Sequence, residues 1–222
     1  MKIIEAVTNR LNFLRIHKIV NDDENFILEY IASHSKNDID PRLKIKLLEV
    51  LKALVKRSKK PFGMLVILGW RREWNAQYSA LLDETQNLFE EKRYDLKDMN
   101  IDELVKVFSM LKNFDGAVLI NKEGIIIASG IYLINLNPKK ALEKLKLRGE
   151  DLSQAFGFKE KVHTRHITAI TASLILDSTT VYTVSEESQV IRMYENGHII
   201  YSTLKEEQKY LIQKIKENNK NK

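Results

Sequence analysis

Hydrophobic residues in the first 58 positions recur every three or four residues, which is the spacing of amphipathic helices. The first stripe consists of Ile4, Val7, Leu11 and Leu14. A second, shorter helix is expected around 26–31, and Asp40 and Pro41 fit the N-cap and first position of a third. We therefore predict an N-terminal helical segment over 1–60. Its apolar stripe must pack on the rest of the chain or on a second copy, which favours an assembly or regulatory role.

The hydrophobic pattern changes at Pro61. Residues 63–69 form a short apolar run bounded by glycines, which indicates a buried strand. Two further runs, 116–121 and 124–130, are separated by a short polar turn and predict a hairpin. Between the first strand and this hairpin the pattern is polar and irregular over 71–99, and it becomes helical over 101–112 behind Asn100 as the N-cap.

The C-terminal part alternates helical and extended patterns. A basic, helix-prone insertion is expected over 138–160, an Ala/Thr-rich helix over 167–176, and a last helix over 204–215 with a frayed tail at 217–222. Three short apolar runs predict strands: 181–184, 190–194 and 198–202. We expect an α/β domain over 61–216, with a mixed central β-sheet flanked by helices and preceded by the helical segment.

Composition limits the environment and the chemistry. The chain has 222 residues and no cysteine, so disulfides and thiolate metal sites are excluded. The longest apolar stretches fall far short of the roughly 20 residues that span a bilayer. Glu5 interrupts the first apolar stretch, and no signal-peptide pattern is present. We expect a soluble, cytoplasmic protein with no membrane partner.

The net charge of +6 comes mainly from the first 60 residues. Nucleic-acid binding would need this basic excess on a face that also carries aromatic or glycine-rich partners. The densest cluster instead lies at the end of a predicted helix, where cations complement the macrodipole: Lys52, Lys56, Arg57, Lys59 and Lys60. We favour this helix-end interpretation and expect no nucleic-acid partner. A basic helical protein that binds nucleic acid or another protein remains the alternative.

Nucleotide-binding fingerprints of the Rossmann and P-loop types are absent, as is the nucleophile elbow of the α/β-hydrolases. Three short polar clusters remain as candidates. The first is Asp115-Gly116-Ala117, at a predicted helix-to-strand junction. A carboxylate beside two minimal side chains lets a ligand approach the backbone while the acid reaches a hydroxyl or a metal. Taken alone, a turn aspartate before a strand explains it equally well.

The second cluster precedes a predicted helix and reads His163-Thr164-Arg165-His166-Ile167-Thr168. A hydroxyl, a guanidinium and an imidazole at a helix N-terminus would make an anion site. Metal binding by the two histidines and a merely solvated helix cap are the alternatives. The third cluster is Ser185-Glu186-Glu187-Ser188, after a predicted strand, where paired carboxylates suit a divalent cation bound to phosphates. A charged turn would also explain it.

Taken in order, the three clusters resemble the diadenylate cyclase (DAC) domain, the family that makes cyclic di-AMP from two ATP. The resemblance covers about 61–204 and includes the hairpin at 192–200. The family's arginine-histidine motif commonly reads Gly-Thr-Arg-His-Arg, so His163 and Ile167 depart from it.

The resemblance implies a role for each matching residue. Asp115 would orient or deprotonate the ribose 3′-hydroxyl, and Gly116 and Ala117 would line the ribose. Thr164, Arg165 and His166 would grip the triphosphate, and Thr168 matches a further hydroxyl position. Ser185 would bind phosphate and Glu186 a divalent cation, Mg²⁺ or Mn²⁺. The backbone of Leu133 would contact adenine.

The same resemblance implies ATP as substrate and the chain itself as partner. Two domains would face each other so that each 3′-hydroxyl meets the other nucleotide's α-phosphate, in a dimer or a higher oligomer. A catalytically weak nucleotide-binding module of the same fold is the alternative.

Overall fold

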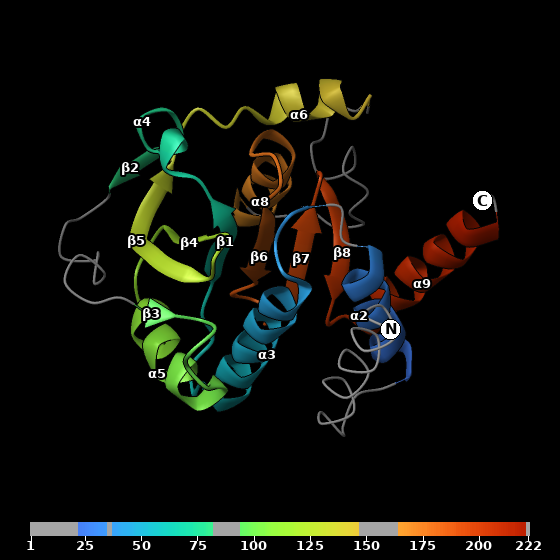
Figure 1. Ribbon diagram of the computed structural model, residues 1–222, viewed down its shortest axis with the longest axis horizontal. Coiled ribbons are helices and arrows are strands. Elements are labelled where there is room, and N and C mark those ends of the chain that lie inside the picture. Colours follow the sequence, from blue (N-terminus) through green and yellow to red (C-terminus); the bar gives the residue numbers. More distant parts are fainter. Residues whose placement is uncertain (1–21, 35–36, 82–93, 147–163, 221–222) are drawn as a thin grey trace, which may run out of the picture.

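The computed structural model describes residues 22–34, 37–81, 94–146 and 164–220. Its centre is an eight-stranded sheet in the order β2-β5-β4-β1-β6-β7-β8, with β3 also paired to β5 (Figure 1). The strands are β1 Met64–Trp70, β2 Ser79–Leu81, β3 Tyr94–Asp95, β4 Ala117–Asn121, β5 Ile125–Leu133, β6 Thr180–Val184, β7 Ile191–Glu195 and β8 His198–Ser202. Among the described strands, β1 and β4 alone pair in parallel, so the sheet is mixed, as predicted.

Helices flank this sheet. They are α2 Asp22–His34, α3 Pro41–Arg57, α4 Asn75–Tyr78, α5 Ile101–Leu111, α6 Pro138–Lys144, α8 Thr164–Ile175 and α9 Lys205–Lys220, with a 3₁₀ turn η1 at Arg72–Trp74. Two predicted caps are confirmed. The Asp40 carboxylate accepts a hydrogen bond from the Arg42 amide at 2.8 Å, and Asn100 forms a capping box with Glu103.

Both faces of the sheet are covered. Alternate residues of β1 point to opposite sides, as a strand requires: Met64, Val66 and Leu68 pack in one cluster, Leu65 and Ile67 in the other. The first cluster is completed by α3, α5, α2 and α9, and the second by α8. The sheet is therefore buried on two sides, which leaves its edges and strand ends for chemistry.

The apolar stripe of α3 packs on the sheet within the same chain. Leu47, Leu48 and Leu51 are fully buried in the cluster that holds β1 and β4 side chains. Lys44 of the same helix is buried too, and its Nζ lies 2.6 Å from Glu195 Oε1 of β7. A fully buried lysine needs such a partner, so this ion pair fixes α3 against β7.

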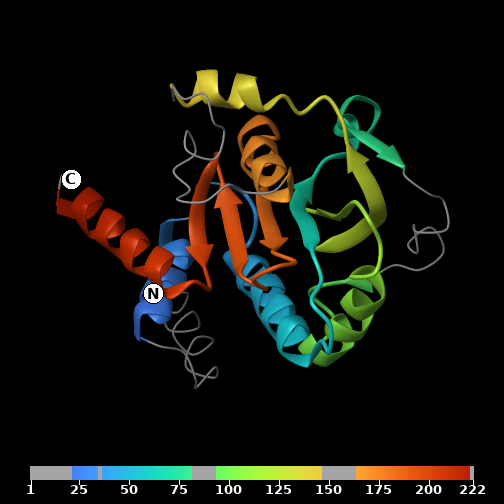
Figure 2. The same ribbon diagram turned by 180° about the vertical axis from the view of Figure 1, so that it is seen from behind.

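At the β8 edge, α2 and α9 pack against each other, and α9 reaches away from the rest of the molecule in both views (Figures 1 and 2). In the described part of the chain no helix is long and apolar enough to cross a membrane.

The structure differs from the expected elements in three places. The helix expected over 167–176 begins earlier, at Thr164, so the second cluster forms its first turn. The stretch 71–99, predicted to be irregular, contains η1, α4, β2 and β3, which add strands beyond β5. The last helix runs on to Lys220 and so includes most of the predicted tail. The predicted stripe at 4–14 and most of the insertion at 138–160 lie outside the described residues, apart from α6 and two residues after it.

Candidate functional site

Strand register brings the first and third sequence clusters to the same end of the central strands. Leu65 at the start of β1 is level with Ala117 at the start of the parallel β4, and Met64 is level with Val184 at the end of the antiparallel β6. Neighbouring strands lie about 4.8 Å apart, so the segments before β4 and after β6 are about two strand spacings apart. The first and third clusters therefore flank the start of β1.

The first cluster has a glycine that no other residue could replace without strain. Gly116 has φ +88°, and a Cβ there would lie 2.8 Å from backbone atoms of Gly130 and Ile131 in β5. Asp115, the residue before Gly116, is exposed just before the start of β4. Ala117 is buried in the core, 1% exposed, rather than open to a ligand.

The second cluster begins α8, with Thr164 exposed and Arg165 reaching across to the start of β1. The Arg165 guanidinium covers Gly63, where a Cβ would lie 2.5 Å from Cζ. Arg165 Nη1 lies 3.1 Å from Glu186 Oε2, which joins the second cluster to the third. Both side chains keep substantial exposure, 41% and 62%, so this ion pair is accessible to a ligand.

His166 points into the core. It is 5% exposed, and its Nδ1 lies 2.9 Å from the Tyr194 hydroxyl. Its Nε2 lies 3.4 Å from Nη1 of Arg192. A neutral imidazole that accepts from the Arg192 guanidinium at Nε2 would carry its proton on Nδ1, within reach of Tyr194 and Thr183.

Arg192 is in turn held by Glu207 in the first turn of α9, through two hydrogen bonds of 2.8 Å. Burial alone would raise the pKa of Glu207, but hydrogen bonds from Arg192 and Ser202 outweigh it and hold that pKa below its ordinary value. Burial raises the pKa of Tyr194. This chain of contacts from α9 to His166 makes the histidine a support for α8 in this structure, and it does not expose the ring to a ligand.

The third cluster is held by a side chain that the sequence did not single out. Gln189 Nε2 lies 3.0 Å from the carbonyl oxygen of Phe62, 2.9 Å from that of Ser185 and 3.0 Å from that of Glu186. This amide therefore ties the turn after β6 to the residues before β1. Its only sequence signal is a polar residue between two strands, which is common in turns.

Two adjoining hollows open at this end of the central strands, beside the start of β1. The larger, called here the Asp115 hollow, has a volume of about 560 Å³. It is lined by Arg57, Lys59, Lys60, Pro61, Phe62, Gly63, Lys112, Asn113, Phe114, Asp115, Arg165 and Glu186. The second, called the Ser185 hollow, has a volume of about 510 Å³ and is lined by Thr164, Arg165, His166, Val184, Ser185, Glu186 and Glu187. Arg165 and Glu186 line both.

The structure thus brings together six of the predicted site residues: Asp115, Thr164, Arg165, His166, Ser185 and Glu186. Four others do not line either hollow: Gly116, Ala117, Leu133 and Thr168. Leu133 ends β5, two residues beyond the Ile131 that pairs with Ala117. His163, the partner in the alternative metal site, lies outside the described residues.

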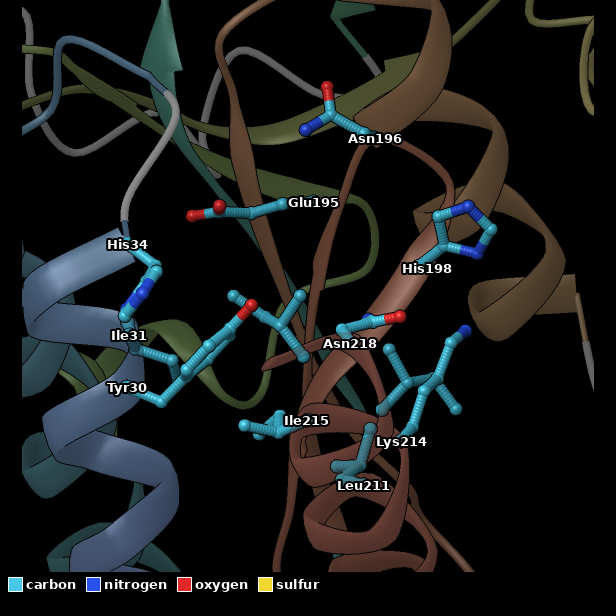
Figure 3. A pocket seen from close by; sticks show the side chains of 12 residues that line it. Tyr30, Ile31, His34, Glu195, Asn196, His198, Leu211, Lys214, Ile215 and Asn218 are labelled. Atoms are coloured by element: carbon cyan, nitrogen blue, oxygen red, sulfur yellow. The ribbon is translucent and has the colours of Figure 1, made fainter. Parts of the chain in front are cut away.

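A further hollow of about 240 Å³ lies between α2, β8 and α9 (Figure 3). Its walls are mostly apolar, with Ile31, Leu211 and Ile215 among them, and His34, His198 and Lys214 at its rim. It holds none of the three clusters. The Asp115 and Ser185 hollows together hold residues of all three clusters, with carboxylates, cations and hydroxyls, and they are the candidate active site.

Comparisons with known proteins identify the family of the chain and similar folds. The family model described as "DAC: DisA bacterial checkpoint controller nucleotide-binding" matches residues 51–199, which include every predicted site residue. A crystal structure titled as a hypothetical membrane spanning protein from Bacillus cereus is similar in fold, with 16% identity, a TM-score of 0.50 and 90% coverage of both chains. A double mutant of DacA from Staphylococcus aureus has 17% identity and a TM-score of 0.43, covering 78% of this chain and 94% of its own. No curated protein matches the sequence.

Proposed function

Because this chain belongs to the DAC family of DisA bacterial checkpoint controller nucleotide-binding domains, we propose that it is a diadenylate cyclase. It would condense two ATP into cyclic di-AMP and two pyrophosphates. One observation carries the proposal: Asp115, Arg165 and Glu186, from three separate segments, line a single hollow at the end of the sheet. The types and positions of these side chains suit a nucleotide whose hydroxyl and phosphates must both be held.

Each side chain has a role that its surroundings permit. Asp115, exposed in the Asp115 hollow, accepts the proton of the ribose 3′-hydroxyl. Arg165 leaves Glu186 to bind phosphate oxygens, because a guanidinium pairs with either group through the same donors. Thr164 and Ser185 line the Ser185 hollow and offer hydroxyl donors to the phosphates of the same nucleotide. His166 supports α8 from the core side.

The reaction balances without a further reagent. The 3′-oxygen of one nucleotide bonds to the α-phosphorus of the other, the bond from that phosphorus to its β-phosphate oxygen breaks, and pyrophosphate leaves. The hydroxyl proton passes to Asp115. A second, reciprocal transfer closes the ring and releases a second pyrophosphate.

A divalent cation fits the residues present, provided that phosphates share in its coordination. In the described part of the chain no three His, Asp or Glu side chains gather as a metal-binding group. Mg²⁺ at nucleotide sites commonly takes only one or two carboxylates and completes its shell with phosphate and water oxygens. The exposed Glu186 supplies such a carboxylate next to the phosphate-binding residues. When bound, the cation would offset the charge on the reacting phosphate.

Catalysis requires two copies of the chain, each holding one ATP, with their candidate sites facing each other. Attack of a 3′-hydroxyl on the α-phosphate of its own nucleotide would give cyclic mono-AMP, so the dinucleotide requires a second ATP. A facing pair of chains holds that second nucleotide in a fixed geometry in place of an improbable encounter. Activity per chain should therefore rise with protein concentration until the pair is formed.

The test compares wild-type protein with Asp115→Asn in ATP and Mn²⁺, with products identified by mass. We expect cyclic di-AMP from the wild type. The variant should lose most of its turnover but bind ATP within about threefold of the wild-type affinity, because the asparagine amide keeps the shape of the carboxylate and loses its basic oxygen. ATP binding without any product from the wild type would instead indicate a nucleotide-binding module. An equal loss of ATP affinity in Asp115→Asn would make Asp115 structural.

A further inference from the structure

Among the residues that the structure describes, five cations line the Asp115 hollow against two carboxylates: Arg57, Lys59, Lys60, Lys112 and Arg165 face Asp115 and Glu186. Three of the five are already engaged. Arg57 pairs with Asp102 at 2.6 Å, Arg165 pairs with Glu186, and Lys112 Nζ lies 2.7 Å from Ser58 Oγ. For Lys59 and Lys60, both exposed, no ion pair occurs within the described ranges.

These two lysines do not belong to the end of α3 as the sequence suggested. The helix ends at Arg57 and is capped by Ser58, so Lys59 and Lys60 lie in the turn that leads into β1. A charge beyond the cap interacts only weakly with the helix dipole, because that interaction falls off within the last turn. The helix-end interpretation therefore leaves their placement in the hollow unexplained.

The turn that carries them is fixed from both sides. Ser58 Oγ donates to the carbonyl oxygen of Lys60 at 2.7 Å and accepts from Lys112 of the α5 end. Phe62, just beyond, is buried, lies under the Lys112 ammonium at 5.5 Å, and accepts from Gln189 through its carbonyl. The backbone of this turn is thus held next to Asp115 and Arg165, and only the lysine side chains need to move to reach a ligand.

The position of the lysines distinguishes the two nucleotides of a facing pair. Under the proposed function, on which this inference rests, the chain's own phosphates occupy the Ser185 hollow, which Lys59 and Lys60 do not line. They line the Asp115 hollow, where the 3′-hydroxyl is held. The α-phosphate that this hydroxyl attacks must come within about 3.5 Å of it, and that phosphate belongs to the other nucleotide.

We infer that Lys59 and Lys60 bind the phosphates of the nucleotide held by the facing subunit, including the departing pyrophosphate. Their charge attracts the incoming triphosphate and stabilises the negative charge that grows on its leaving group. The ligand class is a polyphosphate ester, and the site is complete only when two chains face each other.

The first experiment compares the double variant Lys59→Gln/Lys60→Gln with the wild type in cyclic di-AMP formation from ATP. We expect kcat/KM to fall about 5- to 50-fold, a range that allows for the exposure of both side chains. The matched control is Lys139→Gln/Lys140→Gln, which removes two adjacent exposed charges on α6 away from both hollows and should change the rate less than twofold. A Lys59→Arg/Lys60→Arg variant should keep the rate within about threefold, which separates lost charge from lost folding.

A mixing experiment decides whether the lysines act across the pair. The Asp115→Asn protein is mixed in equal amounts with the Lys59→Gln/Lys60→Gln protein. The linear dinucleotide that a single transfer forms is then followed. In a mixed pair only the subunit with intact Asp115 can attack. If the lysines serve the facing nucleotide, that same subunit lacks them, and mixing restores nothing beyond the residual rate of the lysine variant.

In an equal mixture about half of the pairs are mixed, and each mixed pair has one working attack out of two. Restoration of the linear product to about a quarter of the wild-type rate of first transfer would show that the lysines hold the chain's own nucleotide, and would overturn the inference. So would an unchanged rate in the Lys59→Gln/Lys60→Gln variant. Both results leave the proposed function standing. A wild type that makes no cyclic di-AMP would overturn the proposed function itself, together with this inference.

Discussion

Replacing Gly63 by alanine should disable the site while leaving the fold intact. A Cβ at Gly63 would lie 2.5 Å from Cζ of Arg165, and ordinary carbon contacts need about 3.5–4.0 Å. The guanidinium must therefore move by about 1 Å or more, away from its 3.1 Å contact with Glu186. Misplacement of a positioning group by about 1 Å can cost up to about 100-fold in rate, and we expect kcat/KM to fall about 10- to 100-fold.

The same change should hardly affect stability. The obstacle is the far end of a long, 41% exposed side chain that can swing into solvent. A glycine-to-alanine change at an ordinary φ also gains about 0.4–1 kcal/mol from the unfolded state. We expect the melting temperature of Gly63→Ala to stay within about 3 °C of the wild type, by differential scanning fluorimetry.

Gly116→Ala is the matched control, because there the new Cβ meets backbone. With φ at +88° and three backbone atoms at 2.8 Å, the variant should lose about 2–4 kcal/mol and melt roughly 5–15 °C lower. Unchanged activity in Gly63→Ala would refute the placement of Arg165. A melting temperature lowered as much as in Gly116→Ala would show that Gly63 is a folding position instead.

Two further changes test the supports of the site. Glu207→Gln should weaken the acid dependence of stability. The pKa of Glu207 lies below its ordinary value of 4.5 in the folded chain, so the wild type loses stability as the pH falls below 4.5. The urea midpoint of the variant should therefore fall less than that of the wild type between pH 6 and pH 3.5. An identical acid loss in both proteins would mean that the Glu207–Arg192 contact is not formed in solution. Leu51→Ala should cost about 2–5 kcal/mol in urea unfolding, because the side chain is fully buried between α3 and the sheet. A loss below about 1 kcal/mol would show that α3 does not share the core.

Local signals predicted the well-bounded elements. Asp40 and Asn100 marked two helix starts by the chemistry of their side chains, and the apolar runs at 63–69 and 116–121 marked the two parallel strands. These features depend on residues close in sequence. The strands β2 and β3 are only two or three residues long and form by pairing with β5. No local pattern predicts that pairing.

The candidate site divides in the same way. The sequence identified Asp115, Arg165 and Glu186 as candidate site residues from their side-chain chemistry. That they line one hollow follows only from the three-dimensional structure, in which β1 pairs with β4 and β6. It did not predict that His166 faces the core, because a histidine in the first turn of a helix can point either way. Nor did it place Lys59 in the hollow, since that depends on contacts of the turn with α5.

The central claim is the conversion of two ATP into one cyclic dinucleotide, and its stoichiometry tests it most directly. Wild-type protein is incubated with ATP and Mn²⁺ over a dilution series, and ATP, pyrophosphate and dinucleotide are quantified together. We predict two pyrophosphates released for each cyclic di-AMP formed, with activity per chain falling as the protein is diluted. Release of orthophosphate with ADP, or no consumption of ATP at any protein concentration, would contradict the account.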